Sequence, residues 1–150
     1  MNNEEIENLL SREEFTLATI SKRSWAFFID EVLLSFIFVA IIWNSFVQAT
    51  TFEEMIALTN SFVLEYMALK IIYQTFFVAI YGATIGKILL KIRVIETATL
   101  DKPRPLAAFN RAVFRIISEI IFYLGFLWGA LNPSRQTWHD FSAKTLVINA

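Results

Sequence analysis

Hydrophobic residues are concentrated in three long runs that polar stretches separate. The runs at 25–47 and 62–81 are long enough to cross a bilayer, because about 20 apolar residues in a helix span its ~30 Å hydrocarbon core. The run at 116–131 has only 16 residues, which is marginal for a full crossing. The pattern therefore predicts an all-α membrane protein with two transmembrane helices and a third, short membrane-inserted helix.

Two short runs outside the membrane segments, 91–96 and 145–149, have the pattern of strands. They can pair only if they lie on the same side of the membrane. In one topology the 116–131 segment crosses the bilayer and leaves the C-terminal tail outside. In the other it enters, bends near Gly125 and returns. We favour the second topology, in which the two strands pair in the cytoplasm.

The first residues, 1–20, are acidic and differ from the remainder, 21–150. Ile6, Leu9 and Leu10 are spaced as on one face of a short amphipathic helix. The excess of glutamates nevertheless favours a partly ordered, solvated tail. A signal peptide begins with basic residues, so this segment is not one. We expect an acidic cytoplasmic tail followed by a membrane domain.

The distribution of basic residues predicts the orientation. Residues 82–115 contain seven Lys or Arg and two acidic residues, whereas the loop at 48–61 contains no Lys or Arg. Lys and Arg accumulate on the cytoplasmic side of membrane proteins. We therefore expect the N-terminus and residues 82–115 in the cytoplasm and the 48–61 loop outside.

Composition supports membrane residence and excludes several chemistries. Hydrophobic residues make up 56% of the chain and charged residues 18%, which is more apolar surface than a soluble domain of this size buries. The chain has no Cys and one His, His139, so we expect no metal and no cofactor. The net charge of −1 provides no basic surface for nucleic acid.

Five ionisable residues interrupt the apolar runs: Asp30, Glu31, Glu65, Lys70 and Glu119. A charge at this depth costs a few kcal/mol and marks a partner or a function. Lys70 lies about 16 Å from the inner end of its helix and Asp30 about 9 Å from the inner end of its own, at ~1.5 Å per residue. A lysine side chain covers much of that offset. We expect Lys70 to pair with Asp30 or Glu31, or else to face a neighbouring subunit or water.

The stretch after the second run begins with two glycines. Three residues separate Gly82 from Gly86, and Lys87 follows. A phosphate-binding loop needs four residues between the glycines and a Ser or Thr after the Lys, so we reject that motif. We expect the glycines to provide a close helix-packing face. Three basic residues are expected to face lipid headgroups: Lys87, Arg111 and Arg115.

The motifs, taken in order, resemble the RDD family of small bacterial membrane proteins, named for one Arg and two Asp. SKRSWAFFID carries Arg23 and Asp30 at the positions of the family's Arg and first Asp. The stretch GFLWGALNPSRQTWHDFSAKTLVI carries Asp140 at the position of the second Asp, and GATIGKILLKIRVIE and RAVFR resemble the blocks between them. The chain departs from the family at Asn132, where many members have Asp, and lacks a Gly before DKPRP. The resemblance covers about residues 20–149 and implies a multi-pass protein of the bacterial cytoplasmic (inner) membrane.

The three name-giving positions allow two roles. Asp30 follows Arg23 by seven residues, on the same helix face, and a cytoplasmic tail would bring Asp140 to the same level. Arg23 would then bind both carboxylates and form a structural clasp between the C-terminus and the first helix. The other role is that of an ion relay.

Two functional classes remain. The first is an accessory or scaffold subunit of a membrane complex, which binds a membrane-protein partner or further copies of itself within the lipid bilayer. The alternative is an oligomeric cation- or proton-coupled transporter that uses the intramembrane carboxylates, because two or three helices cannot enclose a pathway. The resemblance adds that a transport role has been suggested for the family. We expect no enzyme activity, since His139 beside Asp140 is accompanied by no nucleophile motif or metal-ligand set.

Overall fold

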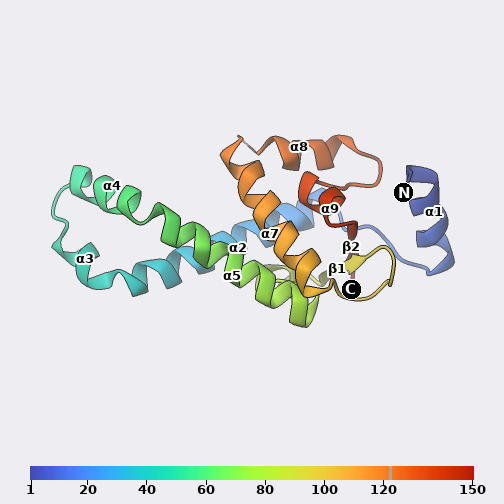
Figure 1. Cartoon of the computed structure of the whole chain (residues 1–150), viewed down its shortest axis with the longest axis horizontal. Coiled ribbons are helices and arrows are strands. Elements are labelled where there is room, and N and C mark those ends of the chain that lie inside the picture. Colours follow the sequence, from blue (N-terminus) through green and yellow to red (C-terminus); the bar gives the residue numbers. More distant parts are fainter. Residues whose placement is uncertain (122) are drawn as a thin grey trace.

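The computed structural model describes residues 1–121 and 123–150, which form helices and one small sheet (Figure 1). In chain order the elements are α1 (Asn3–Arg12), α2 (Ile20–Ile41), α3 (Trp43–Gln48), α4 (Phe52–Ser61), α5 (Val63–Tyr81), α6 (Ile85–Leu89), β1 (Ile92–Glu96), α7 (Pro105–Ile120), α8 (Leu124–Leu131), α9 (Trp138–Ser142) and β2 (Thr145–Asn149).

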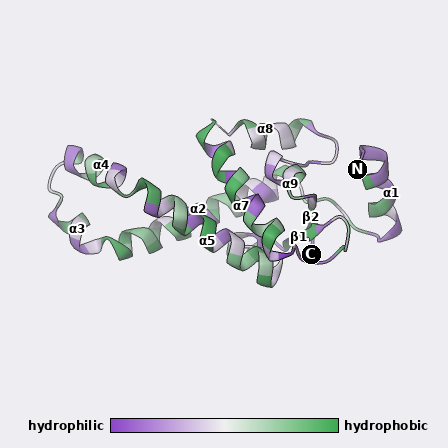
Figure 2. Cartoon of the chain, viewed as in Figure 1, coloured by the Kyte–Doolittle hydropathy of each residue, from purple (hydrophilic) through white to green (hydrophobic). Residues whose placement is uncertain are grey.

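Two helices, α2 and α5, are long and apolar enough to cross a membrane, which confirms the predicted pair. Both are predominantly hydrophobic (Figure 2). The Thr19 side chain caps the start of α2 by accepting from the Lys22 N–H. On the other arm of the hairpin, α5 ends at Gly82, whose φ of +71° is a left-handed conformation that glycine adopts freely. α3 and α4 lie at the end of the molecule farthest from the sheet (Figure 1).

The third apolar run is divided between two helices. α7 and α8 meet at an angle of 104°, and Tyr123, just before α8, has a φ of +61°. Phe122 lies outside the described residues. We expected a bend near Gly125, and the break lies just before it, between Ile120 and Leu124. Gly125 itself belongs to α8 and lets that helix approach α7. A Cβ on Gly125 would lie 2.0 Å from the Ser118 hydroxyl oxygen.

The two strands pair antiparallel, as the sequence predicts. Val94 is opposite Val147 and Ile95 is opposite Leu146. Because successive side chains of a strand point to opposite faces, these two pairs lie on opposite sides of the sheet. The N–H of Ala18 also donates to the Val147 carbonyl at 3.0 Å, which joins the segment before α2 to the same sheet. Because β1 precedes α7 and β2 follows α9, the bent α7–α8 pair leaves from the sheet and returns to it. A bent pair of this kind is either a broken span or a re-entrant segment, and the pairing of the two strands requires that they lie on the same side of a membrane.

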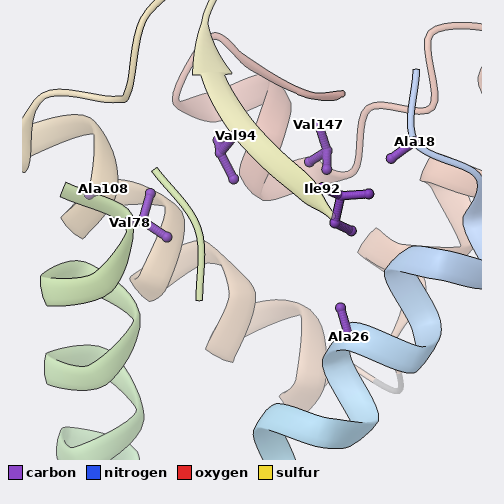
Figure 3. Close-up of a cluster of buried hydrophobic side chains, with 7 residues drawn as sticks. All are labelled: Ala18, Ala26, Val78, Ile92, Val94, Ala108 and Val147. Atoms are coloured by element: carbon purple, nitrogen blue, oxygen red, sulfur yellow. The ribbon is translucent and has the colours of Figure 1, made fainter. Parts of the chain in front are cut away.

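Both faces of the sheet are covered by hydrophobic side chains. The face toward the long helices belongs to a cluster shown in Figure 3: Ala18, Ala26, Val78, Ile92, Val94, Ala108 and Val147. The other face is covered by α1, whose Ile6 is 1% exposed and packs with Ile95 and Leu146. Burial of an Ile side chain contributes roughly 1.5–3 kcal/mol. Residues 3–12 therefore form a packed helix rather than a solvated tail, despite their charge.

Candidate functional site

Asp30 lies at the junction of α2, α5 and α6 and is 1% exposed. Its Oδ1 accepts hydrogen bonds from the Tyr73 hydroxyl at 2.7 Å and from the Gly86 N–H at 2.8 Å. Its Oδ2 accepts from the Thr84 hydroxyl at 2.6 Å. Three donors thus satisfy this buried carboxylate without a cation. Asp30 ties α2 to the middle of α5 and to the start of α6.

The approach of α6 to α2 depends on Gly86. A Cβ at this position would lie 2.2 Å from the Ala26 carbonyl oxygen and 2.9 Å from Asp30 Oδ1. Gly86 therefore provides a close packing contact. Gly82 instead ends α5, and its carbonyl accepts from the Val94 N–H at 2.7 Å. The prediction of one packing face through both glycines is wrong, because the chain turns between them.

A second buried carboxylate, Asp140 in α9, joins distant parts of the chain. Arg23 binds its Oδ2 and Arg111 binds its Oδ1. The N–H and the hydroxyl of Thr137 also donate to Oδ2, at 3.2 and 2.9 Å. Arg111 donates in addition to the Thr145 hydroxyl at the start of β2. One carboxylate thus connects α2, α7, α9 and β2.

Arg23 reaches only one of its two predicted carboxylates. It binds Asp140 and the carbonyl oxygen of Arg135. Within residues 1–121 and 123–150, no hydrogen bond or ion pair joins Arg23 to Asp30, because donors from α5 and α6 occupy both oxygens of Asp30. The second cation at Asp140 is Arg111 instead.

Burial and neighbouring charges set the protonation of the α9 groups. Burial acts to raise the pKa of Asp140, but the charges of Arg23 and Arg111 outweigh it and hold that pKa well below its usual value. Burial also holds the pKa of His139 well below its usual value, although Asp140 opposes this shift. The His139 ring nitrogens lie 3.0 and 3.2 Å from the Thr137 hydroxyl oxygen. At neutral pH the centre therefore holds an anion between two cations, beside a neutral imidazole.

Four charged residues form a closed network farther along the membrane helices. Lys70 Nζ lies 3.0 Å from Glu31 Oε1 and also binds Glu119. Arg115 binds the same two glutamates, at 3.2 and 3.3 Å, and donates to Gln74 Oε1 at 2.6 Å. Lys70 thus contacts Glu31, one of its two predicted partners, and Glu119, which was not predicted. Two cations and two anions balance one another.

Removing one member of this network is expected to destabilise the chain more than removing an opposite pair. Lys70→Met leaves two glutamates with only Arg115, and we expect a loss of roughly 2 kcal/mol. Lys70→Met/Glu119→Gln restores the balance of charge and should recover most of that loss. Thermal unfolding in detergent, followed by tryptophan fluorescence, measures both, with the exposed Lys91→Met as control. If the losses of stability from Lys70→Met and Glu119→Gln simply add in the double variant, the two residues do not interact and the network is refuted.

Three basic residues lie inside the protein rather than at its surface. Arg111 is fully buried, Arg115 is 7% exposed and Lys87 is 9% exposed, so the prediction that they face lipid headgroups is wrong. Arg111 and Arg115 of α7 meet carboxylates of α9 and α2, and α6 is held against α2 at Gly86. Glu65, by contrast, is exposed on α5, and the described part of the chain offers it no ion-pair partner.

The uncharged residues that complete these sites were missed from the sequence. Tyr73 and Thr84 follow Asp30 by 43 and 54 residues, and hydroxyl residues are too common for spacing to identify them. Gln74, in contrast, could have been identified from the sequence, because an amide in the middle of an apolar run needs a hydrogen-bond partner.

A partly open cavity of about 230 Å³ lies among these elements. It is lined by Ile20, Arg23, Ser24, Phe27, Asp30, Gln74, Lys87, Arg115, Tyr123, Phe126, Thr137 and His139. Among the described residues, no three His, Asp or Glu side chains are placed to hold a metal ion.

Comparison with known protein families identifies the family of this chain. The RDD family model matches residues 17–144. The chain belongs to the RDD family. An uncharacterized protein of Rickettsia prowazekii (strain Madrid E) is 26% identical over 69 residues, which is 46% of this chain and 38% of that protein. No solved structure matches this RDD protein.

The residues at the three name-giving positions of this RDD protein belong to two separate sites. Arg23 and Asp140 bind each other directly. Asp30 instead holds α6 through the Gly86 N–H and the Thr84 hydroxyl. Both buried carboxylates are saturated with donors, which is the arrangement of groups that fix a fold.

Proposed function

We propose that this RDD protein is an accessory or scaffold subunit of a membrane complex in the bacterial inner membrane. The observation that carries the proposal is the closed charge network of Lys70, Arg115, Glu31 and Glu119. A relay needs groups that are free to exchange an ion or a proton, whereas each of these cations is bound to both anions. The intramembrane charges therefore support structure, and the exposed surface is left for function.

Large apolar side chains project from the part of the helical hairpin that is farthest from the sheet. Phe36 is 70% exposed, Phe52 is 76% exposed and Leu64 is 75% exposed. Glu65 is exposed beside Leu64, about 24 Å from the end of α5 at Tyr81, at ~1.5 Å per residue. A carboxylate facing lipid is costly, and a partner helix that supplies a donor removes the cost. This surface supports docking of another membrane protein.

The orientation is proposed from charge. The linker and the start of α7 carry the excess of Lys and Arg, and the sheet lies between them. The N-terminus, the sheet and the C-terminal strand then lie in the cytoplasm, with the α3–α4 end outside.

The native mass of the full chain, extracted with its surrounding lipid, tests the scaffold role. We expect a foreign membrane protein at fixed stoichiometry in the wild type and at least tenfold less of it with Glu65→Gln. Glu53→Gln, which alters an exposed carboxylate in α4, is the matched control and should retain the partner. A monomer, or a partner that Glu65→Gln leaves in place, would refute the proposal.

An oligomeric cation- or proton-coupled transporter is the second candidate, because Asp30 lines a partly open cavity. Transport predicts that vesicles containing the wild type show ion-dependent proton flux, and that Asp30→Asn abolishes it in a chain that still inserts. The scaffold role predicts no flux from either protein. Flux that depends on Asp30 would replace the first proposal with this one.

A further inference from the structure

The cavity between α2 and α8 is lined by more cations than carboxylates. Arg23 comes from α2, Lys87 from α6 and Arg115 from α7, whereas Asp30 is the one carboxylate among the described lining residues. Both oxygens of Asp30 already accept hydrogen bonds. The cavity therefore has a positive wall of three cations. Arg23 and Arg115 are already paired with carboxylates beyond the lining, so Lys87 is the cation of this wall without an ion-pair partner among the described residues.

Lys87 is the unusual member of this wall. It is 9% exposed, and its Nζ forms no hydrogen bond or ion pair with any residue that the structure describes. The Lys87 side chain lines the cavity, and a charged amine in a largely buried place is stabilised by an anion beside it. Burial, together with the charges of Arg111 and Arg115, holds the pKa of Lys87 well below its usual value. Nε and Nη2 of Arg111 are also buried without a partner. Arg111 does not line the cavity, whereas the Lys87 side chain does, so Lys87 is the cation placed to meet an anion that enters it.

The rest of the lining is apolar and aromatic. Phe27, Tyr123 and Phe126 line the cavity, and the Arg115 guanidinium lies 4.7 Å from the centre of the Phe27 ring. The volume of about 230 Å³ is below the roughly 300–1,000 Å³ of sites for drug-sized ligands. A compact anion, either alone or carrying a short apolar group, fits this lining.

We propose that this cavity binds a phosphate group, with Lys87 as its main ligand and Arg23 and Arg115 completing the positive wall. Lysine binds phosphate as a point charge, and arginine adds planar, directed donors. The phosphate is either free or part of an anionic lipid, and the recognising chemistry is the same for both. The site is independent of the scaffold role, because it does not use Glu65 or the outer end of the hairpin.

Binding to the purified full chain in a neutral detergent tests the free form. Equilibrium dialysis with radiolabelled inorganic phosphate is expected to show saturable binding of one phosphate per chain. Lys87→Met, which keeps the apolar stem, should weaken this binding at least tenfold. Lys91→Met, which removes an exposed lysine, should leave it unchanged.

A second arm tests the lipid form. Chains are reconstituted with phosphatidylglycerol and phosphatidylcholine, and native mass spectrometry counts the lipids retained. We expect one phosphatidylglycerol per wild-type chain and none with Lys87→Met. Binding in either arm supports the site, and the arm in which it occurs identifies the source of the phosphate. Binding in neither arm, or binding that Lys87→Met does not weaken, overturns the proposal.

The folding of the variant is itself informative. Lys87→Met removes a largely buried amine that makes no hydrogen bond or ion pair with the described residues, so in phosphate-free buffer the variant should unfold at a temperature no lower than that of the wild type. Should it fail to fold, the wild type alone decides the question. In that case phosphate binding to the wild type must saturate, and sulfate but not chloride must displace the bound phosphate. Binding that does not saturate, or that sulfate does not displace, overturns the site.

Discussion

Asp140→Asn is expected to lower the free energy of unfolding by about 3–5 kcal/mol, because it leaves two arginines of a buried ion-pair centre without an anion. Arg111 and Asp140 are both fully buried, so water cannot replace the lost charge. The substitution also weakens the link between α2 and α9 that Arg23 provides. Thermal unfolding of the full chain in mild detergent, followed by the fluorescence of its four tryptophans, measures the loss.

A matched control is Asp101→Asn, which alters an exposed carboxylate in the loop after β1. Exposed substitutions of this kind usually change stability by no more than about 0.5 kcal/mol. Adding Arg111→Met to Asp140→Asn removes one of the stranded cations and should restore part of the stability. If Asp140→Asn and Asp101→Asn unfold at the same temperature, the buried ion-pair centre at Asp140 does not stabilise the fold.

Gly86→Ala is expected to be nearly as damaging, with a loss of about 3 kcal/mol, at the upper end of the range for overpacking. The new Cβ would lie 2.2 Å from the Ala26 carbonyl oxygen, and backbone atoms of two packed helices cannot move aside independently. Separation of α6 from α2 would also break the hydrogen bond from the Gly86 N–H to Asp30. The same fluorescence-detected unfolding, together with the amount of protein recovered from membranes, reports the effect.

Gly82→Ala provides the comparison, because the same atom is added four residues earlier. There the nearest atom to a new Cβ is Lys102 Cβ at 3.3 Å, so the main cost is the left-handed backbone at φ +71°. That strain amounts to roughly 1–2 kcal/mol. We therefore expect Gly86→Ala to be the more destabilising of the two. The opposite order would mean that the turn after α5 matters more than the contact between α6 and α2.

The parts of the fold that could be predicted from the sequence are those that a one-dimensional pattern determines. The two spans follow from the length of an apolar run, and the strand pairing follows from two short alternating segments that must lie on one side. Lys70 required a carboxylate because an unpaired charge in the bilayer is costly. The bend between α7 and α8 was less predictable, because Gly125 lies in a helix and the left-handed residue is Tyr123.

The candidate site was less predictable, because basic residues have the same pattern whether they face lipid or the protein interior. Arg111 and Arg115 lie on an amphipathic helix, and the sequence alone favours an interfacial helix. The structure packs α9 and α5 against that face, so both arginines are buried with carboxylate partners. Arg23 shows the same limit. Its spacing from Asp30 predicts contact, but the hydroxyl of Tyr73 occupies Asp30 Oδ1.

The position of Asp140 also imposes an order on the biogenesis of the protein. Arg23 precedes it by 117 residues and Arg111 by 29 residues, so both arginines are synthesised before the anion that neutralises them. Until Asp140 is made, Arg23 and Arg111 lack the carboxylate that they share in the folded chain. β2 follows Asp140 within a few residues. The pairing of the charges and the closing of the sheet therefore both wait for the same short stretch of the chain, Asp140 and β2, to be synthesised.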